Sequence, residues 1–159
     1  MSITVLDDFL TEAEIAEYRA FVSRQRHMTQ APILHNQKAV TTAFWERFGE
    51  RLRTEAQVQR ITDHVTVSRS TVPMNWHYDA SKEGETHKVL VYLDDIAGTL
   101  FEMEDGRIQE VAARPGRAVV FDFRLKHAGA PIPPGRGGKY TIGFRGVVPA
   151  DPCGLTPAV

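Results

Sequence analysis

Three side chains in this sequence could together hold a metal ion. His77 and Asp79 stand two residues apart in the segment 75–80, and His127 follows the apolar run 117–123. If 75–80 is a strand, side chains at i and i+2 point to the same face, so an imidazole and a carboxylate converge on one point. Two ligands hold a catalytic metal poorly, and His127 is the best candidate for the third.

This donor set predicts a particular kind of centre. Two histidines and one carboxylate, with open positions opposite them, form the facial triad of non-heme Fe(II) oxygenases. The pattern H-x-D is short and recurs by chance, so an ordinary surface pair on a strand is the alternative interpretation of His77 and Asp79. A later histidine after an apolar strand, together with a basic residue on the last predicted strand, favours the metal site.

The composition is that of one globular domain. The chain has 159 residues, of which 42% are hydrophobic and 25% charged, which is enough apolar material for one core. Its net charge of −1 predicts no general attraction to nucleic acid or to a membrane surface. The single cysteine, Cys153, leaves no intramolecular disulfide, which suits a reducing compartment. We find no signal peptide and no membrane-length apolar run, so we expect a cytoplasmic protein, with its oligomeric state left open.

Two helices are predicted near the start of the chain. Thr11 and Glu14 form a T-x-x-E capping box, which begins a helix that runs to about Arg24. A second helix is predicted from about residue 42 to residue 56, with large apolar side chains at helical spacing. The segment 26–40 between them has no clear period, and we interpret it as a loop or irregular strand that could line a substrate pocket.

From residue 61 on, the pattern changes from helical to strand-like. Short β-branched and apolar runs alternate with turn signals, and Asp105-Gly106 indicates a hairpin between 99–103 and 107–111. Many short strands of this kind are typical of a sandwich, jelly roll or small barrel. Further strands are predicted at 2–6, 61–70, 75–80, 87–93, 117–123 and 139–148. The prediction is one mainly β domain (α+β) over 1–159, with helical support in 8–58 and the β core in 61–148.

The sequence resembles the Fe(II)- and 2-oxoglutarate-dependent dioxygenases, and most closely their prolyl 4-hydroxylase-like branch. The resemblance covers most of the chain and rests first on His77-x-Asp79, His127 and Lys139-Tyr140-Thr141. It extends to V-L-D-D-F-L-T-x-x-E-x-x-x-Y at 5–18, V-Y-L-D at 91–94, Gly98-Thr99-Leu100, and P-G-R-A-V-V-F at 115–121. It implies a double-stranded β-helix, a cupin-like jelly roll, with iron at its open end.

The resemblance also implies a site for the cosubstrate. In this family a lysine or arginine on a late core strand pairs with the C5 carboxylate of 2-oxoglutarate, and Lys139 with Thr141 matches that pattern. Arg136 and Arg145 are the alternatives, because the gap after the distal histidine is longer than is usual in the family. Tyr92 matches a strand tyrosine whose hydroxyl bonds the same carboxylate, and its alternative is a core tyrosine with a satisfied hydroxyl.

The implied reaction is a hydroxylation. 2-Oxoglutarate would chelate Fe(II) through its C1 carboxylate and 2-oxo group, with release of succinate and CO2 and with ascorbate as reductant. Asp79 favours hydroxylation, because related halogenases carry a small residue in place of the carboxylate. A small molecule such as an amino acid or a biosynthetic intermediate is the favoured substrate. A protein hydroxylase of the prolyl type and a non-catalytic metal-binding jelly-roll sensor are the alternatives.

Four residues outside the triad carry further expectations. Trp76 alternates with the ligands and is predicted to lie in the core. Asp122 is a candidate hydrogen-bond partner for a ligand histidine. His27 and His35 lie in the 26–40 segment and could contact substrate.

Overall fold

The computed structural model describes residues 1–26 and 33–150. Two helices lie in this part of the chain, α1 (Glu12–Arg24) and α2 (Lys38–Ala56). The strands are β1 (Ile3–Leu6), β2 (Ile33–Asn36), β3 (Arg60–Ser70), β4 (His87–Tyr92), β5 (Thr99–Glu102), β6 (Ile108–Val111), β7 (Ala118–Asp122), β8 (His127–Gly129) and β9 (Lys139–Val147). Neither helix has the length and apolar character that a membrane-spanning segment needs.

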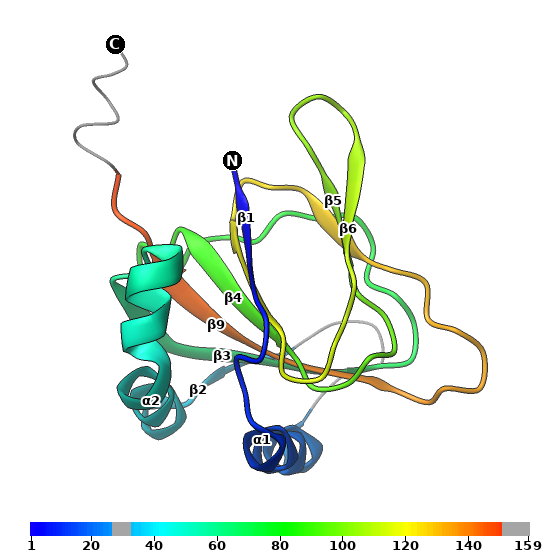
Figure 1. The fold of residues 1–159 in the computed structure, drawn as a ribbon, viewed down its shortest axis with the longest axis horizontal. Helices are drawn as coiled ribbons and strands as arrows, with labels where there is room; N and C mark the ends of the chain where they lie inside the picture. The colour runs from blue at the N-terminus through cyan, green and yellow to red at the C-terminus, as the bar shows by residue number, and fades with distance from the viewer. Residues whose placement is uncertain (27–32, 151–159) are drawn as a thin grey trace.

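The strands form two antiparallel sheets. The larger sheet has the order β1-β7-β4-β9-β3-β2, and the smaller has the order β6-β5-β8. Figure 1 shows the two helices on one side of the larger sheet and the β5–β6 hairpin on the other. This mainly β architecture with two N-terminal helices agrees with the prediction.

Both predicted helices are present. In α1 the capping box is complete, because Thr11 Oγ1 accepts a hydrogen bond from Glu14 N at 3.2 Å and Glu14 Oε1 accepts one from Thr11 N at 2.8 Å. Helix α2 begins at Lys38, four residues before the predicted start. The apolar spacing begins only at Phe44, so it does not mark this first turn.

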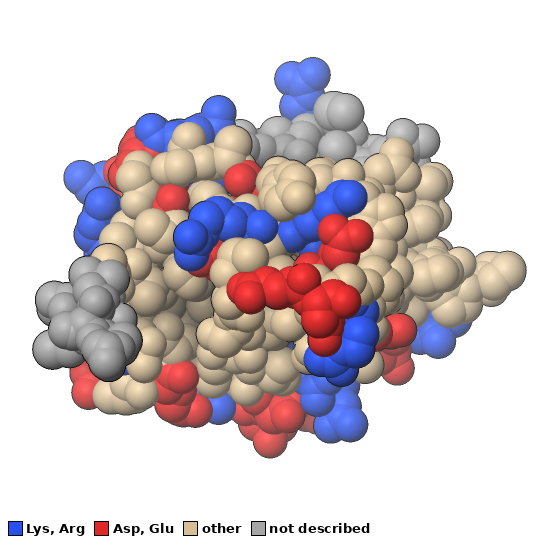
Figure 2. All heavy atoms as spheres, turned by 90° about the horizontal axis from the view of Figure 1, so that it is seen from above, with Lys and Arg blue, Asp and Glu red and all other residues tan. Residues whose placement is uncertain are grey.

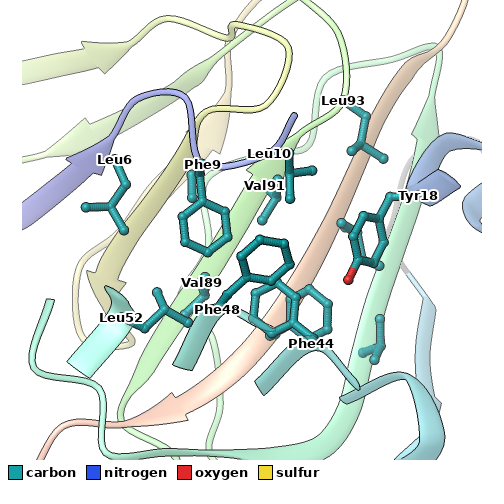
Figure 3. Close-up of a cluster of buried hydrophobic side chains, with 14 of the residues drawn as sticks. Leu6, Phe9, Leu10, Tyr18, Phe44, Phe48, Leu52, Val89, Val91 and Leu93 are labelled. Atoms are coloured by element: carbon teal, nitrogen blue, oxygen red, sulfur yellow. The ribbon is translucent and has the colours of Figure 1, made fainter. Parts of the chain in front are cut away.

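The main core lies between the helices and the larger sheet. Phe44 of α2 stacks on Phe144 of β9 with ring centroids 3.6 Å apart, and Phe48 packs on Phe9 at 4.8 Å (Figure 3). Each buried side chain of this size stabilises the fold by about 1.5–3 kcal/mol. A second cluster around Phe101 and Phe121 fills part of the space between the two sheets. The helices therefore cover the outer face of the larger sheet, and its inner face remains for the site.

Two predictions of local structure near the site are wrong. Residues 75–80 do not form a strand. His77 is the one residue of this segment with β-type backbone pairing, in an isolated bridge to His127. Residues 127–129, which are not among the predicted strands, form β8, which pairs with β5. Both segments are too short and too polar for their pairing to leave an alternating pattern in the sequence.

The described residues of the 26–40 segment contain one strand and the start of a helix. Residues 33–36 form β2, which pairs with β3, and residues from 38 on belong to α2. His27 lies outside the described residues, as does Cys153, and the side chain of His35 is not described.

Candidate metal centre

The three predicted ligands lie together in the structure. His77 Nε2 lies 3.9 Å from Asp79 Oδ1, and His127 Nε2 lies 3.6 Å from Asp79 Oδ2. One ligand atom from each of the three residues falls within 4.8 Å of the others. Donor atoms at these separations surround a single point, which suits one cation.

Backbone pairing sets the distance between the two histidines. His77 N donates to His127 O at 2.9 Å, and His127 N donates to His77 O at 3.0 Å. Residues that exchange both hydrogen bonds in this way have Cα atoms about 5.5 Å apart. The peptide groups thus bring the two imidazoles side by side, with ring centroids 4.2 Å apart, although 75–80 is not a strand.

A backbone carbonyl orients each imidazole ring. His77 Nδ1 lies 2.7 Å from Asn75 O, and His127 Nδ1 lies 2.9 Å from Leu125 O. A carbonyl oxygen can only accept, so Nδ1 is the donor in both rings, and a neutral ring then has its lone pair on Nε2. Metal-binding histidines commonly show this arrangement, with the second ring nitrogen donating to a carbonyl.

Asp122, the predicted partner of a ligand histidine, does not have that role. Its carboxylate accepts from Arg124 Nη2 at 2.7 Å and lies 4.0 Å from His87 Nε2. The carbonyl groups two residues before each ligand, Asn75 O and Leu125 O, are the partners instead.

Burial and charge prepare the donor atoms for a cation. Asp79 Oδ2 is buried and has no hydrogen-bond partner, which is costly unless a cation compensates it. Burial alone would raise the pKa of the Asp79 carboxyl, but Lys88 and the two ligand histidines bring it below its usual value. Burial also lowers the pKa of His127 to about 4. At neutral pH the site therefore offers a carboxylate and a neutral imidazole, the forms that bind a divalent metal.

The ligands open onto a cavity whose floor is the inner face of β3, β4 and β9. In an antiparallel sheet, directly paired residues of neighbouring strands point to the same face. On the inner face, the residues of β9 pair with residues of β3 or β4, or of both, in four rows: Ser70–Lys139, Ser68–Thr141–Tyr92, Thr66–Gly143–Leu90 and Arg145–Lys88. The cavity is lined by His77, Asp79, His127, Lys88, Lys139 and Thr141, with apolar and hydroxyl side chains between them. The cavity therefore joins the triad to two lysines.

Lys139 lines this cavity, with Thr141 two residues further along β9. Its Nζ donates to Gly98 O at 3.0 Å. Burial lowers the pKa of Lys139 to about 8, although Asp94 opposes the shift. A lysine held this way retains a charge near neutral pH and has a neutral partner that an anion could replace.

Tyr92 has a bonded hydroxyl. The residue is fully buried, and its hydroxyl oxygen lies 2.6 Å from Thr99 Oγ1. Its ring lies 5.8 Å from Lys139 Nζ. The structure therefore gives the Tyr92 hydroxyl the partner that the core-tyrosine interpretation expects.

The two alternatives to Lys139 are engaged elsewhere. Arg136 Nη2 donates to Asp95 Oδ1 at 2.6 Å in an exposed loop and does not line the cavity. Arg145 shares the inner face of β9, but both its terminal nitrogens donate to Ala80 O, at 3.0 and 2.6 Å. Arg145 thus holds the residue that directly follows Asp79.

Comparisons with known proteins give the fold. No protein-family model matches the sequence, and no curated protein matches it either. A prolyl 4-hydroxylase from Pseudomonas putida matches in structure with a TM-score of 0.63 at 14% identity, over 91% of this chain and 92% of that one. The fold is that of the 2-oxoglutarate and Fe(II) oxygenases.

Two further solved structures agree. The viral collagen prolyl hydroxylase of Paramecium bursaria Chlorella virus-1, solved with 2-oxoglutarate, matches with a TM-score of 0.63 at 15% identity, over 92% of this chain and 95% of that one. SnoN, an α-ketoglutarate-dependent epimerase of nogalamycin biosynthesis, matches with a TM-score of 0.62 at 14% identity, over 91% and 78%. Identities this low show the oxygenase fold, and the chemistry must be argued from the residues.

Two features near the ligands were missed or misread in the sequence. Lys88 was not singled out, although it stands in phase with Tyr92 in the apolar run 87–93 and so shares its inner face. Trp76 was predicted to be buried, but it is 41% exposed, and Tyr78 is 59% exposed. These two side chains alternate with the ligands, and they face solvent because nothing covers that face of 75–80 among the described residues.

Proposed function

We propose that this chain is an Fe(II)- and 2-oxoglutarate-dependent dioxygenase that hydroxylates a C–H bond of a small molecule. The observation that carries the proposal is the triad of His77, Asp79 and His127, in which two free Nε2 lone pairs and an unpaired buried carboxylate oxygen surround one point. The donor set fits Fe(II) in type and number, and leaves positions for further ligands. The two facing antiparallel sheets are also consistent with a double-stranded β-helix.

The triad, Lys139 and Thr141 would each have a separate role. When bound, Fe(II) and 2-oxoglutarate supply the oxidative chemistry, with succinate and CO2 as products. The triad holds the metal, and Lys139 binds the C5 carboxylate in place of its neutral partner Gly98 O, because the charge-assisted bond is the stronger one. Thr141 offers a hydroxyl on the same face of β9. We infer no direct role for Tyr92 beyond support of this end of the cavity through Thr99.

Two classes of substrate fit the surroundings of the triad. Apolar side chains such as Met74 and Ile132 line the cavity and suit a small molecule that enters it. The exposed rings of Trp76 and Tyr78, one on each side of His77, favour a protein segment as the second candidate. The charges on the face of the molecule in Figure 2 are mixed in sign, which gives no support to nucleic acid as substrate.

The test is turnover with a matched binding measurement. With Fe(II), ascorbate and 2-oxoglutarate, the parent chain should release succinate, even without a substrate. His77→Ala should lose both succinate release and Mn(II) binding, measured by calorimetry. His64→Ala is the control, because His64 is a partly buried histidine outside the cavity that lies 3.7 Å from Glu83.

Two outcomes would contradict the proposal, and they differ. If the parent binds Mn(II) but neither binds 2-oxoglutarate nor releases succinate, the chain is a metal-binding sensor. If His77→Ala binds Mn(II) as tightly as the parent, the triad is not the metal site. Addition of candidate amino acids or of a proline-containing peptide should raise succinate release above the uncoupled level, and thus separates the two substrate classes.

A further inference from the structure

Lys88 is a buried lysine in the cavity that makes no hydrogen bond or ion pair with the described residues, and burial lowers its pKa. Its exposed fraction is 6%, and it lines the cavity that contains the triad. Within residues 1–26 and 33–150, its Nζ has no hydrogen-bond acceptor and no carboxylate oxygen within 4.0 Å. Lysine is almost never buried to this extent unless it is paired. The cavity is therefore where an anion for Lys88 would have to bind.

The side chain of Lys88 is directed over the floor of the cavity by a glycine. A Cβ atom at Gly143 would lie 2.5 Å from Lys88 Cε and would overlap Thr66 Oγ1. In the β4–β9 register Lys88 pairs with Arg145, whereas Gly143 pairs with Leu90. The lysine thus leans along β9, away from its own row and toward Thr141 and Lys139.

The charges near the triad leave an excess of positive charge once a metal binds. Asp79 is the carboxylate whose charge acts on Lys88, and Arg145 is the other charged neighbour. A divalent metal would take the charge of Asp79, and Arg145 already has Glu85, 4.0 Å from its Nε. Lys88 and the metal would then face the cavity as two adjacent cations, and such a site attracts a carboxylate.

We infer that Lys88 binds the metal-side carboxylate of the cosubstrate, as a second carboxylate-binding residue separate from Lys139. The inference rests on the proposed function. Lys88 and Lys139 both line the cavity of the triad, and Lys88 lies over Gly143, four residues from Lys139 on the same face of β9. Because the two side chains reach the cavity from different positions, the two ends of a diacid would meet two different lysines.

The experiment uses Mn(II)-loaded protein and two 2-oxo acid probes, of which only one carries a second carboxylate. 2-Oxoglutarate has both ends, whereas pyruvate has only the 2-oxo acid end. Lys88→Met should weaken both probes by at least about tenfold, since each loses one charge-assisted bond. Lys139→Met should weaken 2-oxoglutarate to a similar degree and leave pyruvate unchanged. Lys38→Met, an exposed lysine at the start of α2, should change neither.

Metal affinity distinguishes anion binding from a merely structural role. Lys88→Met removes a cation beside the site, so it should bind Mn(II) as tightly as the parent or more tightly. Lys88→Arg keeps the charge and should bind pyruvate within a few-fold of the parent. That result would show that the loss of pyruvate binding in Lys88→Met comes from the loss of the charge and not from misfolding.

Two results would overturn the inference. If Lys88→Met binds 2-oxoglutarate and pyruvate like the parent, its anion is not the cosubstrate, and a carboxylate of the substrate becomes the explanation to test. If Lys88→Met binds Mn(II) more weakly in the absence of either probe, the lysine acts through Asp79. Failure of the proposed function would look different, because the parent itself would then bind neither probe.

Discussion

Replacement of Arg145 by methionine should loosen the segment that carries Asp79. Arg145 donates two hydrogen bonds to Ala80 O, and its Nε lies 4.0 Å from Glu85 Oε2. The Glu85 side chain is fully buried and accepts from the amides of Lys82 and Glu83 at 2.7 and 2.8 Å. Arg145→Met would leave Ala80 O without these donors and Glu85 without its nearest cation.

The size of the effect follows from these contacts. A hydrogen bond to a charged group contributes about 1.5–3 kcal/mol. Removal of one partner of a buried ion pair costs about 3–5 kcal/mol of stability. This range already includes part of the contribution of the hydrogen bonds. The Arg145 guanidinium also lies 4.9 Å from the ring centroid of Phe123. We therefore expect Arg145→Met to lower the free energy of unfolding by about 3–5 kcal/mol, or the Tm by roughly 6–20 °C for a chain of this length.

The assay is urea unfolding of the metal-free protein, followed by Mn(II) titration of the folded variant. Arg136→Met is the control, because its ion pair with Asp95 is shorter, at 2.6 Å, but exposed, and should contribute less than about 1 kcal/mol. Arg145→Met should also bind Mn(II) more weakly than the parent, since Asp79 loses its support. A variant within about 1 kcal/mol of the parent and with unchanged Mn(II) affinity would refute the positioning role.

Two more predictions concern the cavity floor. Because burial lowers the pKa of Lys139 to about 8, the free protein loses this ammonium as the pH rises through 8, and 2-oxoglutarate affinity should fall roughly fivefold between pH 8 and pH 9. Lys139→Arg stays charged and should show no such fall in calorimetry, and an equal pH dependence of both proteins would contradict the assignment. Gly143→Ala should lower the free energy of unfolding by about 1–3 kcal/mol and weaken pyruvate binding, because its Cβ takes the space of the Lys88 side chain. Normal pyruvate affinity in a folded Gly143→Ala would contradict this.

The sequence predicted that His77, Asp79 and His127 lie close together better than it predicted the segment that carries the first two. His77 and Asp79 converge because an extended backbone alternates its side chains whether or not it belongs to a sheet. The same alternation, without a sheet to cover the other face, exposes Trp76 and Tyr78. A pattern in sequence gives the direction of side chains along one segment, but it does not say what lies against that segment.

The residues around the triad depended on register, which the sequence does not specify. Lys88 reaches the cavity because β4 pairs with β9 in the one alignment that places it beside Arg145 and next to Gly143. Arg145 lies on the same face of β9 as Lys139, but its partner Ala80 lies 65 residues away in the sequence. Contacts of this range arise only when the sheets are assembled, so neither partner can be read from local spacing.

The bridge between His77 and His127 has a consequence for how the chain folds. In the unfolded chain His77 and Asp79 remain neighbours, but the third ligand lies at the other end of a loop of fifty residues. A metal would therefore meet an incomplete site until that loop closes, and tight binding would report a late event in folding. Once bound, the ion would act as a reversible cross-link between distant parts of a chain that has a single cysteine and no disulfide to do the same.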